Sequence, residues 1–248
     1  SKYNPKKIFY FAGQSSITKS IKYKKETFSS HYNGTKNFLE ILKKEKSNTK
    51  FFKANSGYIF APKNGLINLK CKFSSNKNPY IEVQKKVFNL IKKFRKYELN
   101  LSNLIFLQIE SPLRSNDFFI KKVCLGAKNK KKIVVGNTNT FRDYSWITDI
   151  VKAILLTSNL KTKDCIISAG SKLSGKNIIK EAYKLNGLNY KKYYSINKKF
   201  FRKNDNKFLI GSKKNTSYLK DKFNFKFKIF GNKLIKEMFK VLWKQEST

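Results

Sequence analysis

Apolar runs of strand length alternate along this chain with longer stretches that show the apolar spacing of amphipathic helices. Runs of strand length occupy residues 7–13, 50–56, 101–109, 132–135 and 164–169. A strand that is joined to the next strand through a helix pairs with it in parallel, because the helix carries the chain back across the sheet. The alternation therefore predicts an α/β fold built on a parallel sheet.

The helix-like stretches carry recognisable start and stop signals. Pro79 lies in the favoured first turn of one of them, and Gly187 follows the end of another. We expect helices over residues 26–44, 78–97, 118–125, 146–158, 174–186 and 231–244. Residues 188–228 give a mixed pattern.

The chain is strongly basic, with 55 Lys and Arg against 15 Asp and Glu and a formal net charge of +40 over 248 residues. Such a charge suggests nucleic-acid binding. Only four of the basic residues are arginine, however, and the lysines are spread evenly instead of forming one stripe. Surfaces that read bases favour the arginine fork. We interpret most of the charge as a solvated surface and keep a basic nucleic-acid-binding module as the less favoured alternative.

Cysteine and histidine usage constrains the site chemistry. Cys71, Cys124 and Cys165 are too few and too scattered for a disulfide framework, which favours a reducing compartment and a cytoplasmic location. A single histidine, His31, excludes a His-rich metal site, and we expect it on the surface or in helix packing. We expect no metal site. We also expect no membrane association, because no apolar run reaches about 18 residues.

Two motifs come close to known chemistry. The eleven glycines contain no G-x-G-x-x-G, and residues 170–177 match a phosphate loop except at Asn177, so we interpret that segment as a plain helix start. Tyr80 opens a helix. A lysine four residues after such a tyrosine would complete an acid/base pair, but position 84 is Gln, and Lys85 lies about 100° further round the helix.

Several segments occur in the fixed order of a known family. They resemble those of the GDP-mannose 4,6-dehydratases, which are extended short-chain dehydrogenases/reductases. The Glu-Ser-Pro-x-Arg segment and the Gly-Asn…Arg-Asp-aromatic segment are the more specific signals. The resemblance covers nearly all of residues 5–244 and rests on KIFYFAGQSS (7–16), NGTKNFLE (33–40), NPY (78–80), ESPLR (110–114), GN (136–137) with RDY (142–144), and FR (201–202) with FLIG (208–211).

The resemblance implies a Rossmann-like parallel sheet with a smaller C-terminal substrate domain. Residues 1–110 would form the C-terminal part of the NAD(P)-binding domain. Residues 111–248 would form mainly the substrate domain, with a return strand and helix at about 140–170 on the Rossmann sheet. The chain begins where the family has its fourth strand, so we expect the first strands and the Gly-rich pyrophosphate loop to be lacking.

The implied activity is an NADP-dependent removal of water from the hexose of GDP-mannose or a related nucleotide sugar, through a 4-keto intermediate. Ser56 matches the hydroxyl residue beside the sugar, and Tyr80 matches the tyrosine base. Tyr58 falls where the family has a glutamate, Gln84 where it has a lysine, and Ile109 where it has a histidine. Two of the four central catalytic groups, at positions 58 and 84, are therefore altered.

The binding positions match the family better. Gln14 and Ser15, together with Tyr80, fall at positions that line the cofactor. Three of the four arginines lie in the matching motifs, as expected if guanidinium forks hold a nucleoside diphosphate. The implied substrate-binding residues are Arg114, Asn137, Arg142, Arg202 and Asp205.

A second hypothesis belongs to a different class. Because Tyr58 and Gln84 replace catalytic groups, the protein would be a catalytically silent nucleotide-sugar-binding or oligomerisation partner of an intact enzyme. Another nucleotide-sugar dehydratase or epimerase activity is open within the enzyme class. A homo-oligomer packed through the tyrosine-bearing helix is implied by the resemblance alone.

Overall fold

The computed structural model describes residues 3–161, 163–202 and 204–244. The chain divides into two compact units, each with a hydrophobic core of its own. Unit 1 comprises Ser1–Lys63, Ile67–Phe106 and Ile154–Ile167. Unit 2 comprises Asn64–Leu66, Leu107–Ala153 and Ser168–Thr248.

Unit 1 is built on a parallel four-stranded sheet in the order β1-β2-β4-β9. Its strands are β1 (Lys7–Tyr10), β2 (Lys50–Ser56), β4 (Leu101–Phe106) and β9 (Cys165–Ile167). The β4 strand is buried along its whole length, as expected for a central strand of a parallel sheet that is covered on both faces. The prediction of a parallel α/β fold is confirmed.

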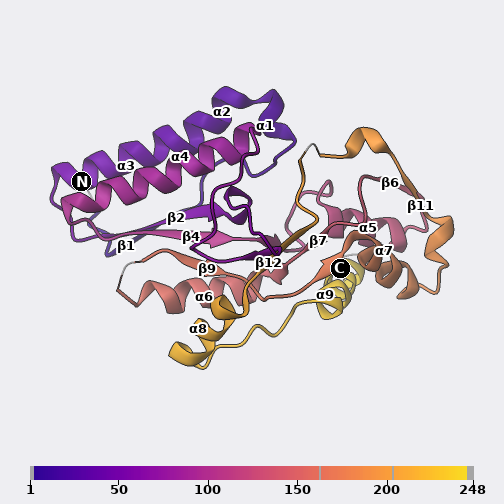
Figure 1. Cartoon of the computed structure of the whole chain (residues 1–248). Helices are drawn as coiled ribbons and strands as arrows, with labels where there is room; N and C mark the ends of the chain where they lie inside the picture. Colours follow the sequence, from indigo (N-terminus) through magenta and orange to yellow (C-terminus); the bar gives the residue numbers. More distant parts are fainter. Residues whose placement is uncertain (1–2, 162, 203, 245–248) are drawn as a thin grey trace. The chain divides into compact units, whose positions relative to one another are not determined.

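Helices cover one face of this sheet (Figure 1). Leu39, Leu42, Leu90 and Ile91 on these helices pack against the wholly buried Phe51 of β2. The helix predicted over residues 26–44 contains a π-helical turn, which places His31 in the interior. The helical elements of this layer are α1 (Lys19–Lys22), α2 (Lys24–Phe28), the π turn (Ser29–Asn33), α3 (Gly34–Lys44), α4 (Pro79–Phe94) and, after α4, a 3₁₀ turn (Arg95–Tyr97).

The prediction of one strand over residues 101–109 is wrong. The β4 strand ends at Phe106, and a separate strand, β5 (Gln108–Glu110), begins two residues later. The β5 strand pairs in parallel with β8 (Tyr144–Trp146) in unit 2. The nearly continuous apolar run carries no signal for this change of partner, because its local pattern does not change where β4 ends; in β5 only Glu110 is fully buried.

The other strands of unit 2 are short. Strand β6 (Ile133–Val135) pairs in parallel with β11 (Tyr194–Ile196). Strand β7 (Phe141–Arg142) lies between β10 (Leu173–Ser174), which is antiparallel to it, and β12 (Phe208–Gly211), which is parallel to it. A further two-residue strand, β3 (Leu66–Ile67), lies in the segment between β2 and α4.

Three helices of unit 2 enclose its core. These are α5 (Phe119–Lys128), α7 (Gly175–Lys184) and α9 (Asn232–Lys244), which pack against one another. Helix α8 (Lys213–Phe223) belongs to the same unit, whereas α6 (Ile147–Ser158) contributes its first residues to unit 2 and its last five to unit 1.

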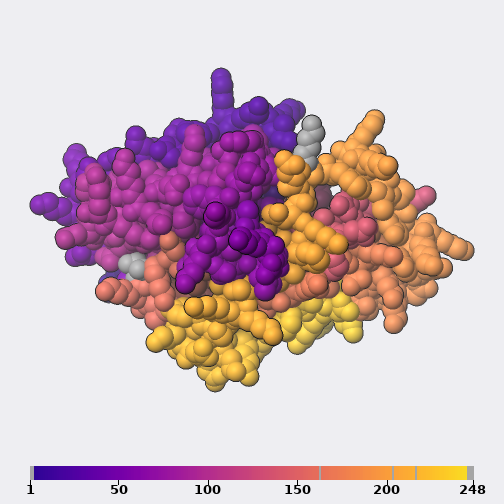
Figure 2. All heavy atoms as spheres, viewed as in Figure 1, coloured from indigo at the N-terminus to yellow at the C-terminus, as the bar shows by residue number. Residues whose placement is uncertain are grey.

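Long side chains project singly into solvent from the outline of the molecule (Figure 2), in keeping with the abundance of lysine. Across the described residues, no helix is both long enough and apolar enough to span a bilayer.

Candidate functional site

The carboxyl end of β2 leads directly into the first group of predicted residues. Ser56 ends the strand, and its Oγ accepts the backbone N–H of Tyr58 (3.3 Å), which lies in the 3₁₀ turn Gly57–Ile59. Helix α4 packs against this turn. Asn78 caps α4 by accepting the backbone N–H of Tyr80 (3.0 Å), which places the half-buried tyrosine in the first turn of the helix. The structure thus brings the turn after β2 and the helix that carries Tyr80 into contact.

His31 joins three segments beside Tyr80. Its Nε2 lies 2.8 Å from the carbonyl oxygen of Gln14, and its Nδ1 lies 3.2 Å from Nε2 of Gln84. The ring of Tyr80 meets the imidazole edge to face, with 5.8 Å between the centroids. Gly13 has a φ of +137°, and a Cβ there would lie 2.3 Å from Cε1 of His31, so only glycine fits this turn.

These hydrogen bonds define the protonation state of the histidine. The Gln14 carbonyl can only accept, so Nε2 of His31 carries the proton and donates it; the Gln84 amide then donates to Nδ1. Burial, together with the positive charge of Lys53, lowers the pKa of His31 to about 4, against the opposing effect of the hydrogen bond to Gln14. Both ring nitrogens of the neutral imidazole are engaged, so His31 holds its neighbours in place and is not a free base.

Because the chain has one histidine, this arrangement can be tested directly. We expect a single set of imidazole ¹⁵N signals with the Nε2–H tautomer and no titration between about pH 5.5 and pH 8, because the folded-state pKa lies well below the ordinary value of about 6.5. Long-range ¹H–¹⁵N spectra across this pH range check the expectation. A midpoint near pH 6.5 in the folded protein would contradict it.

Gln84 is buried, and its side-chain amide is used for His31. Lys85 does not take its place: its ammonium donates to the carbonyl of Ser74 (2.8 Å) and pairs with Glu82. Oε1 of Gln84 is buried and has no hydrogen-bond partner among the described residues. The position that resembles the family's lysine therefore carries no charge here.

A buried cation that the sequence analysis did not single out lies on β2. Lys53 is 0 % exposed; its ammonium donates to the carbonyl of Ala54 (2.8 Å) and lies 5.0 Å from the ring centroid of Tyr10. Burial lowers the pKa of Lys53 to about 7. The sequence offers one signal of this burial, which is a charged residue in the middle of an apolar run. The neighbouring residues in the sequence do not indicate which group the lysine would contact.

The segment after β1 contains the predicted cofactor-lining residues. The Gln14 side chain closes a local turn, because its amide nitrogen donates to the Ser16 carbonyl (2.8 Å) and its Oε1 accepts the Ser16 backbone N–H. Ser15 is exposed. The side-chain amide also donates to Thr27 Oγ1 on α2 (3.3 Å), whereas the contact with His31 is made by the Gln14 backbone carbonyl.

In unit 2, Arg114 is held by the segment that precedes it. One guanidinium nitrogen, Nη1, donates to the carbonyl of Ile109 (2.7 Å) and to Oε1 of Glu110 (3.0 Å). The guanidinium also lies 3.3 Å from the ring centroid of Phe118. Burial raises the pKa of Glu110 to about 7, against the opposing effect of the Arg114 charge.

Arg142 and Asp205 lie far apart in the sequence and form an ion pair between a buried guanidinium and a half-buried carboxylate, with 2.7 Å between Nη2 and Oδ1. Nη1 of Arg142 also donates to the carbonyls of Phe141 (2.8 Å) and Asn206 (2.9 Å). The resemblance to the family implies that both residues bind the substrate, and the structure brings them together. Arg202 and Asn137, in the same unit, are both exposed, and Oδ1 of Asn137 accepts the N–H of Asn139 (2.9 Å).

Asp143, next to Arg142, joins three segments of unit 2. Its carboxylate accepts the backbone N–H groups of Gly170 (2.9 Å), Ser171 (3.1 Å) and Gly211 (3.1 Å), and the Ser171 hydroxyl (3.3 Å). The sequence analysis used Asp143 only as part of a motif. Its donors come from distant parts of the chain, so spacing alone gives no sign of this role.

Comparison with known proteins supplies independent evidence. A family model described as GDP-mannose 4,6 dehydratase matches residues 1–238. GDP-mannose 4,6 dehydratase 1 of Arabidopsis thaliana is 28% identical over 148 residues, which is 57% of this chain and 40% of that protein. The match therefore spans less than half the length of this curated relative.

Solved structures share the fold at low sequence identity. MoeE5, in complex with UDP-glucose and NAD, has a TM-score of 0.84 at 18% identity, covering 98% of this chain and 80% of its own. The dTDP-glucose 4,6-dehydratase of Bacillus anthracis, in complex with NAD, has a TM-score of 0.81 at 17% identity, covering 98% and 74%. RMD from Pseudomonas aeruginosa, complexed with NADPH, has a TM-score of 0.80 at 15% identity, covering 96% and 81%.

At these identities the solved structures show the fold alone, which is similar to that of Rossmann-type nucleotide-sugar enzymes. The family model shows to which family the chain belongs. The match over residues 1–238 covers unit 1 and most of unit 2. The chain therefore belongs to the GDP-mannose 4,6 dehydratase family of nucleotide-sugar dehydratases and epimerases.

Proposed function

We propose that this protein binds a nucleotide sugar, with GDP-mannose as the first candidate, and takes part in NADP-dependent removal of water from the hexose. The observation that carries the proposal is the pairing of the buried Arg142 guanidinium with the half-buried Asp205 in unit 2. Burying a guanidinium is costly unless it is paired and hydrogen-bonded. A chain with only four arginines keeps three of them in the segments that resemble the family's nucleotide-binding motifs, which supports a diphosphate ligand.

The residues of unit 1 fit one part of a nicotinamide cofactor. The unpartnered, buried Oε1 of Gln84 can accept a hydrogen bond from a sugar hydroxyl, and the glycine turn at Gly13 brings the backbone close to the same cluster. The 248 residues contain no Gly-rich pyrophosphate loop, so the other half of the cofactor has no fitting motif in this chain. When bound, such a cofactor supplies hydride exchange.

The chain's own residues have separate roles in this proposal. Tyr80 is placed by the Asn78 cap and the His31 ring to accept a hydroxyl proton from the hexose, with Ser56 as the neighbouring hydroxyl group. Tyr58 occupies the position of the family's glutamate, so a phenol stands where the family has a carboxyl group. Slow turnover, or none, is therefore expected from the chain alone.

One observation favours the second candidate, a silent partner that binds a nucleotide sugar without turnover. Gln84 stands where the family has a lysine, and its amide donates to the neutral His31, so position 84 brings no positive charge to the cluster around Tyr80. Calorimetric binding together with a turnover assay separates the two candidates: binding with turnover supports the enzyme, and binding without turnover supports the silent partner.

We expect Arg202→Ala to weaken GDP-mannose binding by about tenfold to a hundredfold, the loss of one charge-assisted contact to the diphosphate. Arg202 is exposed, so its removal does not open a core. Lys199→Ala is the matched control, an exposed basic residue in the same segment, and is expected to change affinity less than about twofold. Isothermal titration calorimetry with GDP-mannose and UDP-glucose measures both variants.

Equal losses in the two variants would contradict a specific diphosphate contact. No binding of any nucleotide sugar, together with steeply salt-dependent DNA binding, would instead favour the nucleic-acid-binding module.

A further inference from the structure

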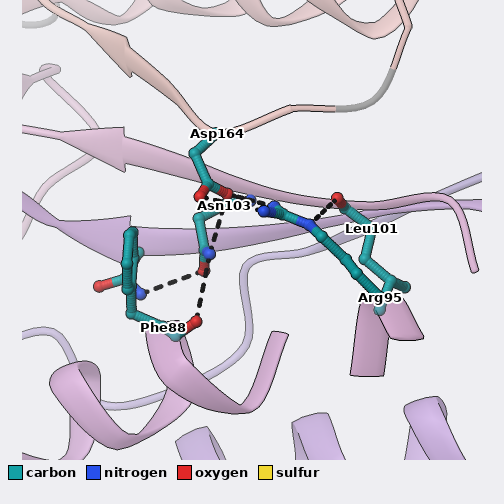
Figure 3. Close-up of polar contacts among 6 residues, drawn as sticks. Phe88, Arg95, Leu101, Asn103 and Asp164 are labelled. Carbon is teal, nitrogen blue, oxygen red and sulfur yellow. Dashed lines mark hydrogen bonds and ion pairs between the residues drawn. The ribbon is translucent and has the colours of Figure 1, made fainter. Parts of the chain in front are cut away.

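A series of polar side chains crosses the sheet of unit 1 from β9 to β2 (Figure 3). Asp164, immediately before β9, accepts both the backbone N–H and the side-chain Nδ2 of Asn103 through Oδ1, each at 3.0 Å. Asn103 lies on β4 and is 0 % exposed. Its Oδ1 accepts Nδ2 of the buried Asn55 on β2 at 3.4 Å. One side chain from each of three consecutive positions in the sheet order thus forms a continuous relay.

The far end of the relay reaches the candidate site. Oδ1 of Asn55 accepts the backbone N–H of Ser56 (2.7 Å), and its Nδ2 also donates to the carbonyl of Gln84 (3.3 Å). Nδ2 of Asn103 donates to the carbonyl of Phe88 (3.4 Å). Gln84 and Phe88 are one helical turn apart, so side chains of the sheet hydrogen-bond two carbonyls of α4 that lie one turn apart.

The carboxylate of Asp164 sets the direction of every bond in this relay. A carboxylate only accepts, so the amide nitrogen of Asn103 faces it and the amide oxygen faces Asn55. Asn55 in turn presents its nitrogen to Asn103, which leaves its oxygen for Ser56. A reversed Asn103 amide would place its oxygen against the carboxylate and against the Phe88 carbonyl, and such contacts between buried acceptors are costly.

We propose that Asp164, Asn103 and Asn55 are positioning residues, which fix Ser56 and the register of α4 over the sheet and thereby the place of Tyr80. Apolar packing is non-directional and does not by itself define where along a strand a helix lies. Directional bonds to two helix carbonyls and to the Ser56 amide do define it. The functional meaning rests on the proposed function, whereas the positioning itself is a property of unit 1.

Substituting Arg95 distinguishes an effect on the positioning of the site from an effect on stability. Its Nε donates to the carbonyl of Leu101 (3.0 Å), and its guanidinium pairs with both oxygens of Asp164 (Figure 3). Losing Arg95 removes an ion pair but leaves a carboxylate that still accepts both N–H groups of Asn103. Losing the carboxylate removes the element that orients the relay.

The decisive comparison is therefore Asp164→Asn against Arg95→Gln, with the ¹⁵N signals of His31 as the readout, since Gln84 hydrogen-bonds Nδ1 of that ring. The asparagine side chain introduced by D164N keeps the shape of the aspartate but adds a donor, so the relay can reverse. We expect D164N to shift or split the imidazole and Gln84 amide signals. We expect R95Q to lower stability while leaving those signals in place.

Two further variants complete the design. Asn55→Ala cuts the relay at its site end and is expected to reproduce the D164N spectrum. Ser102→Ala removes a buried hydroxyl on β4 that has no hydrogen-bond partner among the described residues, and is expected to leave the signals unchanged. Should D164N fail to fold, N55A decides the question by the same spectra.

A folded D164N or N55A protein with wild-type His31 signals would overturn the proposal, as would an R95Q spectrum that shifts as far as that of D164N. Calorimetry with GDP-mannose keeps the proposed function separate, because the diphosphate contacts expected of Arg142 and Arg202 lie in unit 2 and D164N leaves them in place, so D164N should weaken binding less than Arg202→Ala does. If the wild-type protein binds no nucleotide sugar, the proposed function fails. The ¹⁵N spectra of the variants still test whether Asp164, Asn103 and Asn55 position the residues of unit 1. Where turnover is measurable, D164N should lower kcat about tenfold or more with KM unchanged.

Discussion

Replacing Lys53 by methionine is expected to raise the free energy of unfolding by about 3–5 kcal/mol below pH 7, because the change removes a fully buried amine. Burial lowers the pKa of Lys53 from 10.5 to about 7, and each pKa unit corresponds to about 1.4 kcal/mol. The ammonium donates to the Ala54 carbonyl and has the ring of Tyr10 beside it. Methionine fills similar space without a charge.

The pH dependence follows from the direction of this shift. Below about pH 7 both the folded and the unfolded protein carry the Lys53 proton, so the full cost of burying the charge is present. Between about pH 7 and pH 10.5 the unfolded state binds more protons than the folded state, and the wild-type protein gains stability as the pH rises. His31, whose pKa the Lys53 charge helps to lower to about 4, is neutral across this range.

Urea denaturation of the wild type and the variant at a series of pH values measures the difference. The advantage of K53M should be largest at the low end and should shrink toward about pH 10. Lys36→Met is the control, a lysine that is exposed on α3, and should show neither the gain nor its pH dependence. A K53M protein that is less stable than the wild type at pH 6 would show that the amine is a required structural donor.

Asp143→Ala is expected to lower the free energy of unfolding by about 3–5 kcal/mol, because it leaves several buried donors without an acceptor. The carboxylate is 0 % exposed and accepts three backbone N–H groups, from Gly170, Ser171 and Gly211, besides the Ser171 hydroxyl. Water cannot reach these groups unless the structure opens. The loop at residues 170–171 and the end of β12 would separate from β7.

The experiment is denaturation at about pH 8, above the pKa of Asp143, which burial raises to about 6, so that the carboxylate form is compared. Asp117→Ala, an exposed aspartate of the same unit, is expected to cost less than about 0.5 kcal/mol. Asp143→Asn keeps the shape but turns an NH₂ group toward backbone donors, so it should also destabilise. A loss below about 1 kcal/mol in both Asp143 variants would mean that the donors find other acceptors.

The sequence predicted the parallel sheet because periodicity reports burial locally. The strand expected at residues 50–56 is β2 (Lys50–Ser56), and the helix expected from residue 78 is α4 (Pro79–Phe94), with Asn78 as its cap. Proline in the first turn and an asparagine before it are local signals. Such features depend on a few consecutive residues, so they can be predicted without knowing the tertiary contacts.

Other features were outside the reach of local patterns. The π turn that buries His31, and the division of the 101–109 run between β4 and β5, depend on what each segment meets across the structure. Lys53 looks like any other lysine in a chain that has many. Whether a lysine is solvated or buried is decided by the layers above and below its strand, here by the helices that cover β2.

For the motif residues too, the sequence predicted which positions matter, and the structure showed what these residues contact. Resemblance selected Arg142 and Asp205 together, and the structure pairs them. It selected Gln84 as an altered position, but the consequence, an uncharged amide holding a neutral imidazole, appears only when residues 31 and 84 meet.

By itself, the sequence determined the kind of fold, the strand and helix that carry Ser56 and Tyr80, and the segments that match the family. Each of these depends on the pattern of nearby residues or on the order of motifs along the chain. Only the tertiary structure decided which polar groups are buried together: His31 with Gln84, Asp164 with Asn103 and Asn55, and Asp143 with Gly170 and Gly211. The physical reason is that a buried polar group must find a partner wherever packing places one, and packing brings together residues that no sequence spacing connects.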